Sequence, residues 1–320
     1  MKAPLYLGVD LGGTNIKAGL VDHKGNIISE AACPTLPERG QKEVISDLVA
    51  LCFETIAAAG KTKARAAGVG VPGVVNAYNG AVLTAPNLFW KDVALGPLLE
   101  ELLQCPAALD NDANTAAMAE YAAGAAKGYS DALVVTLGTG VGAGVIVNGR
   151  LLRGAHGLAG EIGHMTLYTD GILCNCKNRG CFEMYASARA LRSMGMRAVE
   201  EEPACMLARA VSGEKELVTA ELVARCAQKG DAQSLFIWER YTGDLALGLS
   251  NAARVMDPQI IVIGGGVANA GEFLLAPLRE KIGRLSIDDT AGPVEIACAR
   301  FGAQAGIIGA AMLARSLFDG

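Results

Sequence analysis

Three cysteines, Cys174, Cys176 and Cys181, lie within eight residues of one another. Closely spaced thiols either bind a metal ion or form a disulfide, and the redox compartment decides between the two. The chain begins MKAPLYLGVD, without an apolar stretch followed by a small-residue cleavage site, so we expect a cytoplasmic protein with reduced thiols. Three thiolates then need one further ligand to complete the tetrahedron of a structural zinc site.

The fourth ligand is expected to be a histidine. The chain has three, His23, His156 and His164, and His164 is the best candidate because it lies ten residues before Cys174. A set of three cysteines and one histidine leaves no open coordination position, so the expected Zn²⁺ is structural. The alternatives are free cysteines and a core histidine. The six other cysteines are far apart, mostly in apolar segments, and are expected to be reduced core thiols.

A second polar group follows a short apolar strand expected at 107–109. Asp110, Asn111, Asp112 and Asn114 crowd this strand exit, and a helix is expected from there to about residue 124. Open α/β sheets bind their ligands at the carboxyl ends of strands. Phosphoryl transfer to an alcohol needs one carboxylate that takes the hydroxyl proton. We expect Asp112 to be this base, and a helix-capping role is the alternative.

Two turns rich in glycine and threonine could hold phosphate groups. Glycine lets backbone N–H groups approach a phosphate closely, and Thr14 and Thr139 add hydroxyl donors. Asp10 ends a strand and is suited to hold Mg²⁺ through water. Ordinary glycine-containing hairpins are the alternative. The residues expected to bind ATP are Asp10, Gly12, Gly13, Thr14, Thr136, Gly138, Thr139, Gly140, Gly265 and Gly266.

Apolar periodicity and turn residues predict the elements that position these groups. The expected strands are 5–11, 16–22, 26–33, 66–75, 107–109 and 259–263, and the expected helices include 41–59, 92–103, 234–256 and 303–317. The segment 9–14 aligns with 135–140 at an offset of 126 residues, and the strands that follow align at the same offset. This repeat predicts two related lobes, each presenting one turn to a shared cleft.

Composition excludes several classes of protein. The chain has 320 residues, of which 51% are hydrophobic and 19% charged, so it can bury a large core and is not disordered. Its net charge of −5 and its lack of a basic stripe argue against a nucleic-acid partner. The longest uncharged run, 132–149, contains four regularly spaced glycines and is typical of strand–turn–strand rather than a membrane span. We therefore expect no membrane partner.

Together these motifs resemble the ROK family of bacterial sugar kinases and repressors, over nearly the whole chain. The resemblance rests on DLGGT at 10–14, NDAN at 111–114, TLGTGVG at 136–142, GEIGH at 160–164, and the three cysteines followed by Glu183. It implies an α/β, actin-like ATPase (ribonuclease H-like) fold that binds ATP and sugar between two lobes. From the repeat and the resemblance, the lobes are expected at 1–118 plus 303–320 and at 119–302.

The resemblance also implies roles for individual residues. Asp112 would deprotonate the sugar hydroxyl, and the ring hydroxyls would be contacted by Asn111, Glu161, His164 and Glu183. Zn²⁺ would be bound by His164, Cys174, Cys176 and Cys181, so that His164 uses one ring nitrogen for each task. The family usually has glycine after the second cysteine. This chain has Lys177 there, which affects the expected geometry of the loop.

We expect transfer of the ATP γ-phosphate to the 6-hydroxyl of a hexose, most simply glucose. The same reaction on N-acetylglucosamine, N-acetylmannosamine, mannose, fructose or allose is the alternative, and polyphosphate is an alternative donor. A non-catalytic sugar sensor or a repressor is a further alternative. The repressors of the family carry an extra N-terminal helix-turn-helix, for which a first strand at about residue 4 leaves no room. The resemblance also suggests a homodimer.

Overall fold

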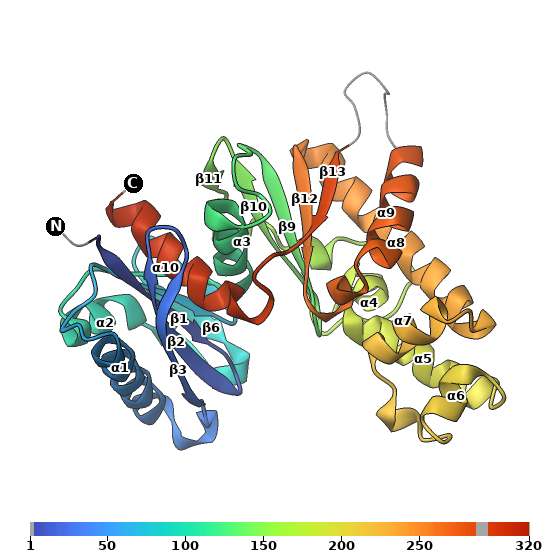
Figure 1. Cartoon of the computed structure of the whole chain (residues 1–320), viewed down its shortest axis with the longest axis horizontal. Coiled ribbons are helices and arrows are strands. Elements are labelled where there is room, and N and C mark those ends of the chain that lie inside the picture. Colours follow the sequence, from blue (N-terminus) through green and yellow to red (C-terminus); the bar gives the residue numbers. More distant parts are fainter. Residues whose placement is uncertain (1–2, 286–293, 320) are drawn as a thin grey trace. The chain divides into compact units, whose positions relative to one another are not determined.

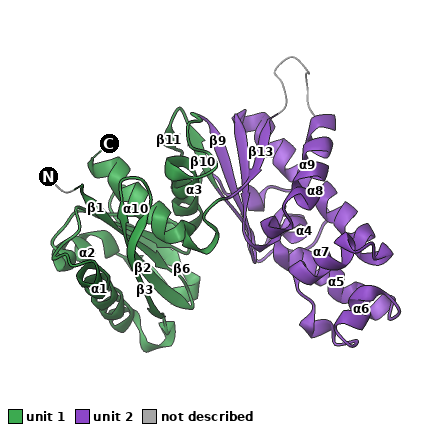
Figure 2. Cartoon of the chain, in the orientation of Figure 1, with its two compact units in different colours: residues 1–130, 144–159, 300–320 green, residues 131–143, 160–299 purple. Residues whose placement is uncertain are grey.

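The computed structural model describes residues 3–285 and 294–319. The chain divides into two compact units, shown in Figure 2. Unit 1 comprises residues 1–130, 144–159 and 300–320, and unit 2 comprises residues 131–143 and 160–299. The lobes expected from the sequence, 1–118 plus 303–320 and 119–302, stay a prediction.

Unit 1 is built on a five-stranded sheet with the strand order β3-β2-β1-β4-β8. Its strands are β1 (Leu5–Leu11), β2 (Asn15–Asp22), β3 (Ile27–Pro34), β4 (Ala67–Val71) and β8 (Ala107–Asn111). The first three strands pair antiparallel, whereas β1, β4 and β8 run parallel. Parallel strands have their carboxyl ends at one edge, so the ends of β1, β4 and β8 form a common edge of the sheet.

Helices cover both faces of this sheet, which explains why β4 is buried along its whole length. The helices of unit 1 are α1 (Gln41–Ala58), α2 (Leu95–Leu103), α3 (Asp112–Ala123) and α10 (Ala305–Phe318), and Figure 1 labels them. Side chains of α1 and α2, including Leu48 and Leu99, share a core with β1 and β4. The helix α10 packs directly on strand backbone, because a Cβ at Gly8 would lie 1.9 Å from the Ile307 carbonyl oxygen.

Two segments of unit 1 differ from the sequence prediction. The single strand expected at 66–75 is wrong, because the chain leaves β4 at Pro72 and Gly73 and enters a separate sheet. This second sheet has the order β5-β6-β7, with β5 (Val74–Asn76), β6 (Ala81–Ala85) and β7 (Trp90–Val93). The helix expected from residue 92 begins only at Leu95, because the preceding residues pair with β6.

The second five-stranded sheet repeats the order of the first, as β11-β10-β9-β12-β13. Its strands are β9 (Ala132–Leu137), β10 (Val141–Val147), β11 (Arg150–Leu151), β12 (Ile260–Gly264) and β13 (Glu295–Cys298). The strands β9, β12 and β13 run parallel, as β1, β4 and β8 do. The repeat predicted from the offset of 126 residues is confirmed as two strand–turn–strand units, and the boundary between the compact units falls within β10.

Most of the helices lie in unit 2, which also carries the cysteine-rich loop. They are α4 (Glu183–Ala186), α5 (Ala188–Glu201), α6 (Met206–Ala210), α7 (Ala220–Gln228), α8 (Ala232–Met256) and α9 (Glu272–Arg284). The long helix α8 confirms the helix predicted at 234–256 within two residues at its start. A search of the described residues finds no helix that combines the length and the apolar character needed to cross a membrane.

Candidate functional site

The strand exit at Asp112 is built by the junction of β8 and α3. Asn111 is the N-cap of α3, and its Oδ1 accepts from the Ala113 N–H at 2.8 Å while its Nδ2 donates to the Gly73 carbonyl at 2.9 Å. The N-cap is therefore Asn111, although the Ala113 N–H also donates to Asp112 Oδ1 at 2.8 Å. Asp112 is the first residue of the helix, and its side chain is exposed. A helix N-terminus favours negative charge, so this position suits a carboxylate that must be ionised.

The neighbouring carboxylate, Asp110, is deeply buried and fully engaged. Its Oδ2 accepts from Arg153 Nε at 2.7 Å, and its Oδ1 accepts from Asn114 Nδ2 at 2.7 Å and from the Asn111 N–H at 2.9 Å. Arg153 could not be recognised from the sequence, because no motif contains it and it is 43 residues from Asp110. Of the two aspartates, Asp112 is thus the one whose carboxylate reaches solvent.

Asp10 lies at the same edge of the sheet. In the strand register Asp10 pairs with Gly70, and Gly70 pairs with Asp110, so Asp10 is two strands, or about 10 Å, from Asp110. The first turn of α10 packs against its carboxylate, since a Cβ at Gly306 would lie 2.6 Å from Asp10 Cγ. Burial raises the pKa of Asp10, and the charge of Lys17 opposes this shift. A bound cation would stabilise the ionised form.

The first Gly/Thr turn joins β1 to β2 and is held by hydrogen bonds from Thr35, which lies outside the turn. The Thr35 hydroxyl donates to the Gly12 carbonyl at 2.7 Å, and the Thr35 N–H donates to the Thr14 carbonyl at 2.9 Å. The Thr14 side chain is exposed, and Gly13 leaves no room for a side chain larger than hydrogen without displacing Asn87. Unit 1 therefore brings Asp10, this turn and the Asp112 corner to one edge of one sheet.

The second turn, between β9 and β10, lies in unit 2 beside the expected glycine triplet. A Cβ at Gly265 would lie 2.2 Å from the Leu137 carbonyl oxygen, so the triplet approaches the end of β9 at backbone distance. Thr136 Oγ1 donates to the Gly142 carbonyl at 3.3 Å, and the Gly138 carbonyl accepts from the Ala188 N–H at 2.9 Å. Thr139, Gly265 and Gly266 are exposed.

The four expected metal ligands gather in unit 2. One ligand atom from each of His164, Cys174, Cys176 and Cys181 lies within 4.8 Å of the others. The Cys176 and Cys181 sulfurs are 3.5 Å apart, close to the roughly 3.8 Å expected between two thiolates on a tetrahedral Zn²⁺. Burial raises the pKa of the Cys174 thiol to about 12, and a bound dication would reverse this by stabilising the thiolate. The donor set fits Zn²⁺.

His164 presents its two ring nitrogens to different partners. Nδ1 lies 3.9 Å from Cys174 Sγ, and Nε2 lies 3.9 Å from Glu161 Oε2. His164 and Glu161 are both exposed and belong to the turn that forms the 3₁₀ helix Ile162–His164. One nitrogen therefore faces the thiol cluster while the other faces an exposed carboxylate, as a residue shared between a metal and a ligand requires.

Glu183 connects the thiol cluster to the second turn. The Cys174 thiol donates to Glu183 Oε1 at 3.1 Å, and a Cβ at Gly140 would lie 2.5 Å from Glu183 Oε2. Unit 2 therefore brings together the thiol cluster, His164, Glu161, Glu183 and the second turn.

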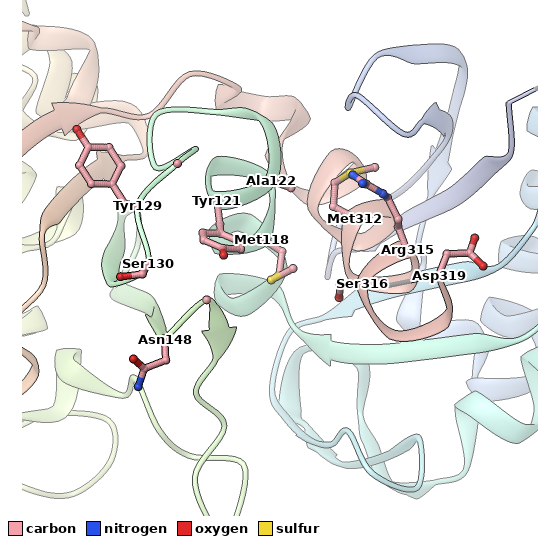
Figure 3. A pocket seen from close by; sticks show the side chains of 12 residues that line it. Met118, Tyr121, Ala122, Tyr129, Ser130, Asn148, Met312, Arg315, Ser316 and Asp319 are labelled. Atoms are coloured by element: carbon pink, nitrogen blue, oxygen red, sulfur yellow. The ribbon is translucent and has the colours of Figure 1, made fainter.

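A pocket of unit 1 lies elsewhere and contains none of the expected site residues. It has a volume of about 600 Å³ and is lined by the last turns of α3 and α10, as Figure 3 shows. Its charged groups have partners already. Arg315 Nη1 donates to the His23 carbonyl at 2.8 Å, and Asp319 accepts from the Tyr6 hydroxyl at 2.6 Å and pairs with Arg65 at 2.8 Å. The pocket consequently offers no distinctive chemistry for a ligand.

The sequence of the chain is similar to that of known proteins over most of its length. The model of the ROK family matches residues 6–316. A glucokinase from Streptomyces coelicolor is 35% identical over 316 residues, which cover 97% of this chain and 98% of that protein. A xylose repressor from Caldicellulosiruptor bescii is 31% identical over 283 residues, 88% of this chain and 70% of the repressor. Both kinases and repressors are therefore relatives.

Solved structures agree with this result. A ROK family glucokinase from Streptomyces griseus, in complex with glucose and AMPPNP, has a TM-score of 0.81 and 34% identity, covering 98% of this chain and 99% of that one. The two sheets with repeated strand order and the match to this structure confirm the predicted actin-like ATPase fold.

Proposed function

Because the chain belongs to the ROK family, we propose that it is a sugar kinase that transfers the γ-phosphoryl group of ATP to the 6-hydroxyl of a hexose, with glucose as the preferred acceptor. The observation that carries the proposal is the exposed carboxylate of Asp112 at the edge of the sheet, next to the fully engaged Asp110. This edge also carries Asp10 and the first Gly/Thr turn.

In the proposed reaction, Asp112 takes the proton of the sugar hydroxyl as its oxygen attacks the γ-phosphorus. Such a general base contributes about 10²- to 10⁴-fold to the rate. Asp10 would hold Mg²⁺, and the N–H and hydroxyl groups of the two turns, with Gly265 and Gly266, would bind the phosphates. Their task is to keep the γ-phosphate in line with the attacking oxygen.

The sugar is bound by Asn111, Glu161, His164 and Glu183. Both polar atoms of the Asn111 side chain already make one hydrogen bond, but each retains one further bonding position. Nε2 of His164 and the exposed Glu161 carboxylate lie on the same turn and suit neighbouring ring hydroxyls.

His164, Cys174, Cys176 and Cys181 would hold Zn²⁺, which would cross-link the loop and favour the thiolate forms. Cys174 Sγ now donates to Glu183 Oε1 at 3.1 Å, and as a thiolate it would no longer do so. Glu183 would then offer both carboxylate oxygens to a sugar hydroxyl. The link between metal and sugar is thus a matter of hydrogen bonding at two residues, His164 and Glu183.

The test is coupled ADP release with Mg-ATP and a panel of glucose, mannose, fructose, allose, N-acetylglucosamine and N-acetylmannosamine. We expect the highest kcat/KM for glucose. An Asp112→Asn variant should lose about 10²- to 10⁴-fold in kcat while it still binds glucose and keeps its melting temperature. Asp47→Asn, which removes a half-buried carboxylate of α1 that pairs with Arg39, is the control and should retain activity.

Each outcome of this experiment has a definite meaning. Full activity of Asp112→Asn would remove Asp112 from the role of base. A preference for an N-acetylated sugar would keep the mechanism and change the substrate. Sugar binding without turnover of any sugar would favour a sensor, which the match to a xylose repressor makes the second candidate. The homodimer and the choice of ATP over polyphosphate stay predictions.

A further inference from the structure

Arg153 belongs to none of the motifs, yet its side chain contacts Asp110, two residues before the expected base Asp112. It follows β11 in the segment 152–159, and its Nε donates to Asp110 Oδ2 at 2.7 Å. The side chain of Asp110 is only 4% exposed and that of Arg153 18% exposed, so the ion pair is largely shielded from water. Burial of an ionised carboxylate without such a partner costs several kcal/mol.

Asp110 also binds residues on both sides of Asp112. Its Oδ1 accepts from the Asn111 N–H, immediately before Asp112, and from Asn114 Nδ2, two residues after it. The Asn114 Oδ1 is buried and has no hydrogen-bond partner within the described parts of the chain, so the Asp110 carboxylate alone orients this side chain. The Asp110 carboxylate, in its ion pair with Arg153, therefore helps to hold the first turn of α3, beside the cap that Asn111 provides.

The backbone at Arg153 is held in place as well. Its carbonyl accepts from the Ala159 N–H at 3.1 Å, which closes the loop 153–159, and a Cβ at Gly157 within this loop would lie 2.8 Å from the Val75 carbonyl oxygen. The guanidinium therefore comes from a braced loop rather than from a freely moving one. A fixed donor is what a positioning role requires, because the geometry of Asp110 follows that of Arg153.

We propose that Arg153 is a positioning residue for phosphoryl transfer, acting through Asp110 to hold Asn111 and Asp112 in the geometry that the reaction needs. Loss of the guanidinium leaves Asp110 Oδ2 without its partner in a largely buried position. The carboxylate can then rotate, and rotation breaks the hydrogen bonds that Oδ1 accepts from Asn111 and Asn114. Displacement of a catalytic group by about 1 Å can cost about 10²-fold in rate. The inference rests on the proposed function, because it concerns the same reaction.

The test compares Arg153→Ala, Asp110→Asn and the double variant, with Arg65→Ala as control. Arg65 also pairs with a carboxylate of unit 1, Asp319, but far along the chain from the site. We expect Arg153→Ala to lower kcat by about 10²-fold with KM for Mg-ATP changed less than about twofold. Methylguanidine should restore part of the lost kcat of this variant, whereas Arg65→Ala should keep the wild-type kcat.

The double variant decides the route of the effect. If Arg153 acts through Asp110, its kcat should be no lower than that of the worse single variant, because both substitutions break one interaction. Losses that multiply, or a kcat of Arg153→Ala within about twofold of the wild type, would overturn the proposal. Should Arg153→Ala fail to fold, Arg153→Met with Asp110→Asn removes both charges, and a wild-type kcat in this pair would also overturn it.

The proposed function and this inference can fail separately. If the wild-type protein turns over no sugar, the proposed function fails. A crystal structure of Arg153→Ala then still tests the inference, since Asn111, Asp112 and Asn114 should have shifted from their wild-type positions. Unchanged positions of these three side chains would refute it.

Discussion

At the scale of single residues, Lys177 is the one visible departure from the family pattern. Its φ is +74°, in the left-handed region that glycine adopts without cost. The loop keeps its turn all the same, because the Lys177 N–H donates to the Cys174 carbonyl at 2.9 Å and the Cys174 N–H donates to the Asn178 carbonyl at 2.8 Å. The departure therefore leaves the four expected ligands together. Its cost is an unfavourable backbone conformation at Lys177.

This cost predicts the effect of restoring glycine. We expect Lys177→Gly to raise the free energy of unfolding by about 1 kcal/mol, since it removes the Cβ that makes a positive φ unfavourable. Lys177→Ala removes the charge but keeps the Cβ, so it should stay within about 0.5 kcal/mol of the wild type. Chemical denaturation of the zinc-loaded proteins measures both. Equal stability of all three would show that the conformation at 177 carries no strain.

Residues that act through their immediate neighbours could be predicted from the sequence, whereas residues that act through distant partners could not. The thiol cluster was predicted because its three cysteines and His164 lie within eighteen residues of each other, and the structure confirms that they gather. Arg153 and Glu120 were missed because their partners are 43 and 180 residues away. Only the fold brings these groups together.

At the scale of elements, most apolar strands and periodic helices were predicted within a few residues, whereas the small sheet β5-β6-β7 was not. The run 66–75 is apolar throughout, so hydrophobicity alone could not divide it between two sheets. The division comes from Gly73, whose φ of +138° turns the chain and whose Cβ would lie 2.1 Å from the Thr84 carbonyl oxygen. The strand β7 was missed because its pattern is too short for periodicity to be seen.

The loop that carries the thiols depends on cross-links more than on regular structure. Its only strand pairing within the described residues consists of isolated bridges, Thr166 with Cys181 and Leu173 with Arg179. Its end is fixed by Phe182, which is fully buried against Gly248 of α8 at a place where a Cβ would come within 2.3 Å of the ring. Between His164 and Phe182, backbone hydrogen bonds such as that from the Leu167 N–H to the Gly180 carbonyl hold the segment, and the metal is expected to add a further cross-link.

Metal removal should therefore affect stability and sugar binding together. A strong chelator is expected to lower the melting temperature by at least about 5 °C and to weaken glucose binding, because the loop carries His164 and contacts Glu183. Calorimetry and titration of glucose measure the two effects. In Cys176→Ser, which lacks one ligand, the chelator should add little, whereas Cys33→Ser should respond like the wild type. A chelator that removes bound zinc and changes neither quantity would contradict the structural role.

At the scale of the whole molecule, the two sheets share one strand order, and the chain passes between the compact units at residues 130–131, 143–144, 159–160 and 299–300. Glu120 in unit 1 binds the chain at the last of these passages and also the segment that follows α3. Its carboxylate accepts from the Arg300 and Phe301 N–H groups at 2.9 and 3.0 Å and from the Ala125 N–H at 2.9 Å. Glu120 is 1% exposed, so each of these N–H groups depends on it.

Through these hydrogen bonds, Glu120 connects the segment after α3 and the chain at Arg300 to the helix that begins with Asp112. Two turns of α3, about 12 Å, separate the two residues. We expect Glu120→Gln to lower the free energy of unfolding by about 2 kcal/mol, because the carboxamide offers one acceptor oxygen and turns an NH₂ group towards an N–H donor. The exposed Glu101→Gln on α2 makes the same chemical change and should stay within about 0.5 kcal/mol of the wild type. Denaturant titration of both variants measures the difference.

If Glu120→Gln were as stable as Glu101→Gln, other contacts would hold the chain at Arg300. The three hydrogen bonds to Glu120 would then have no part in joining this segment to α3.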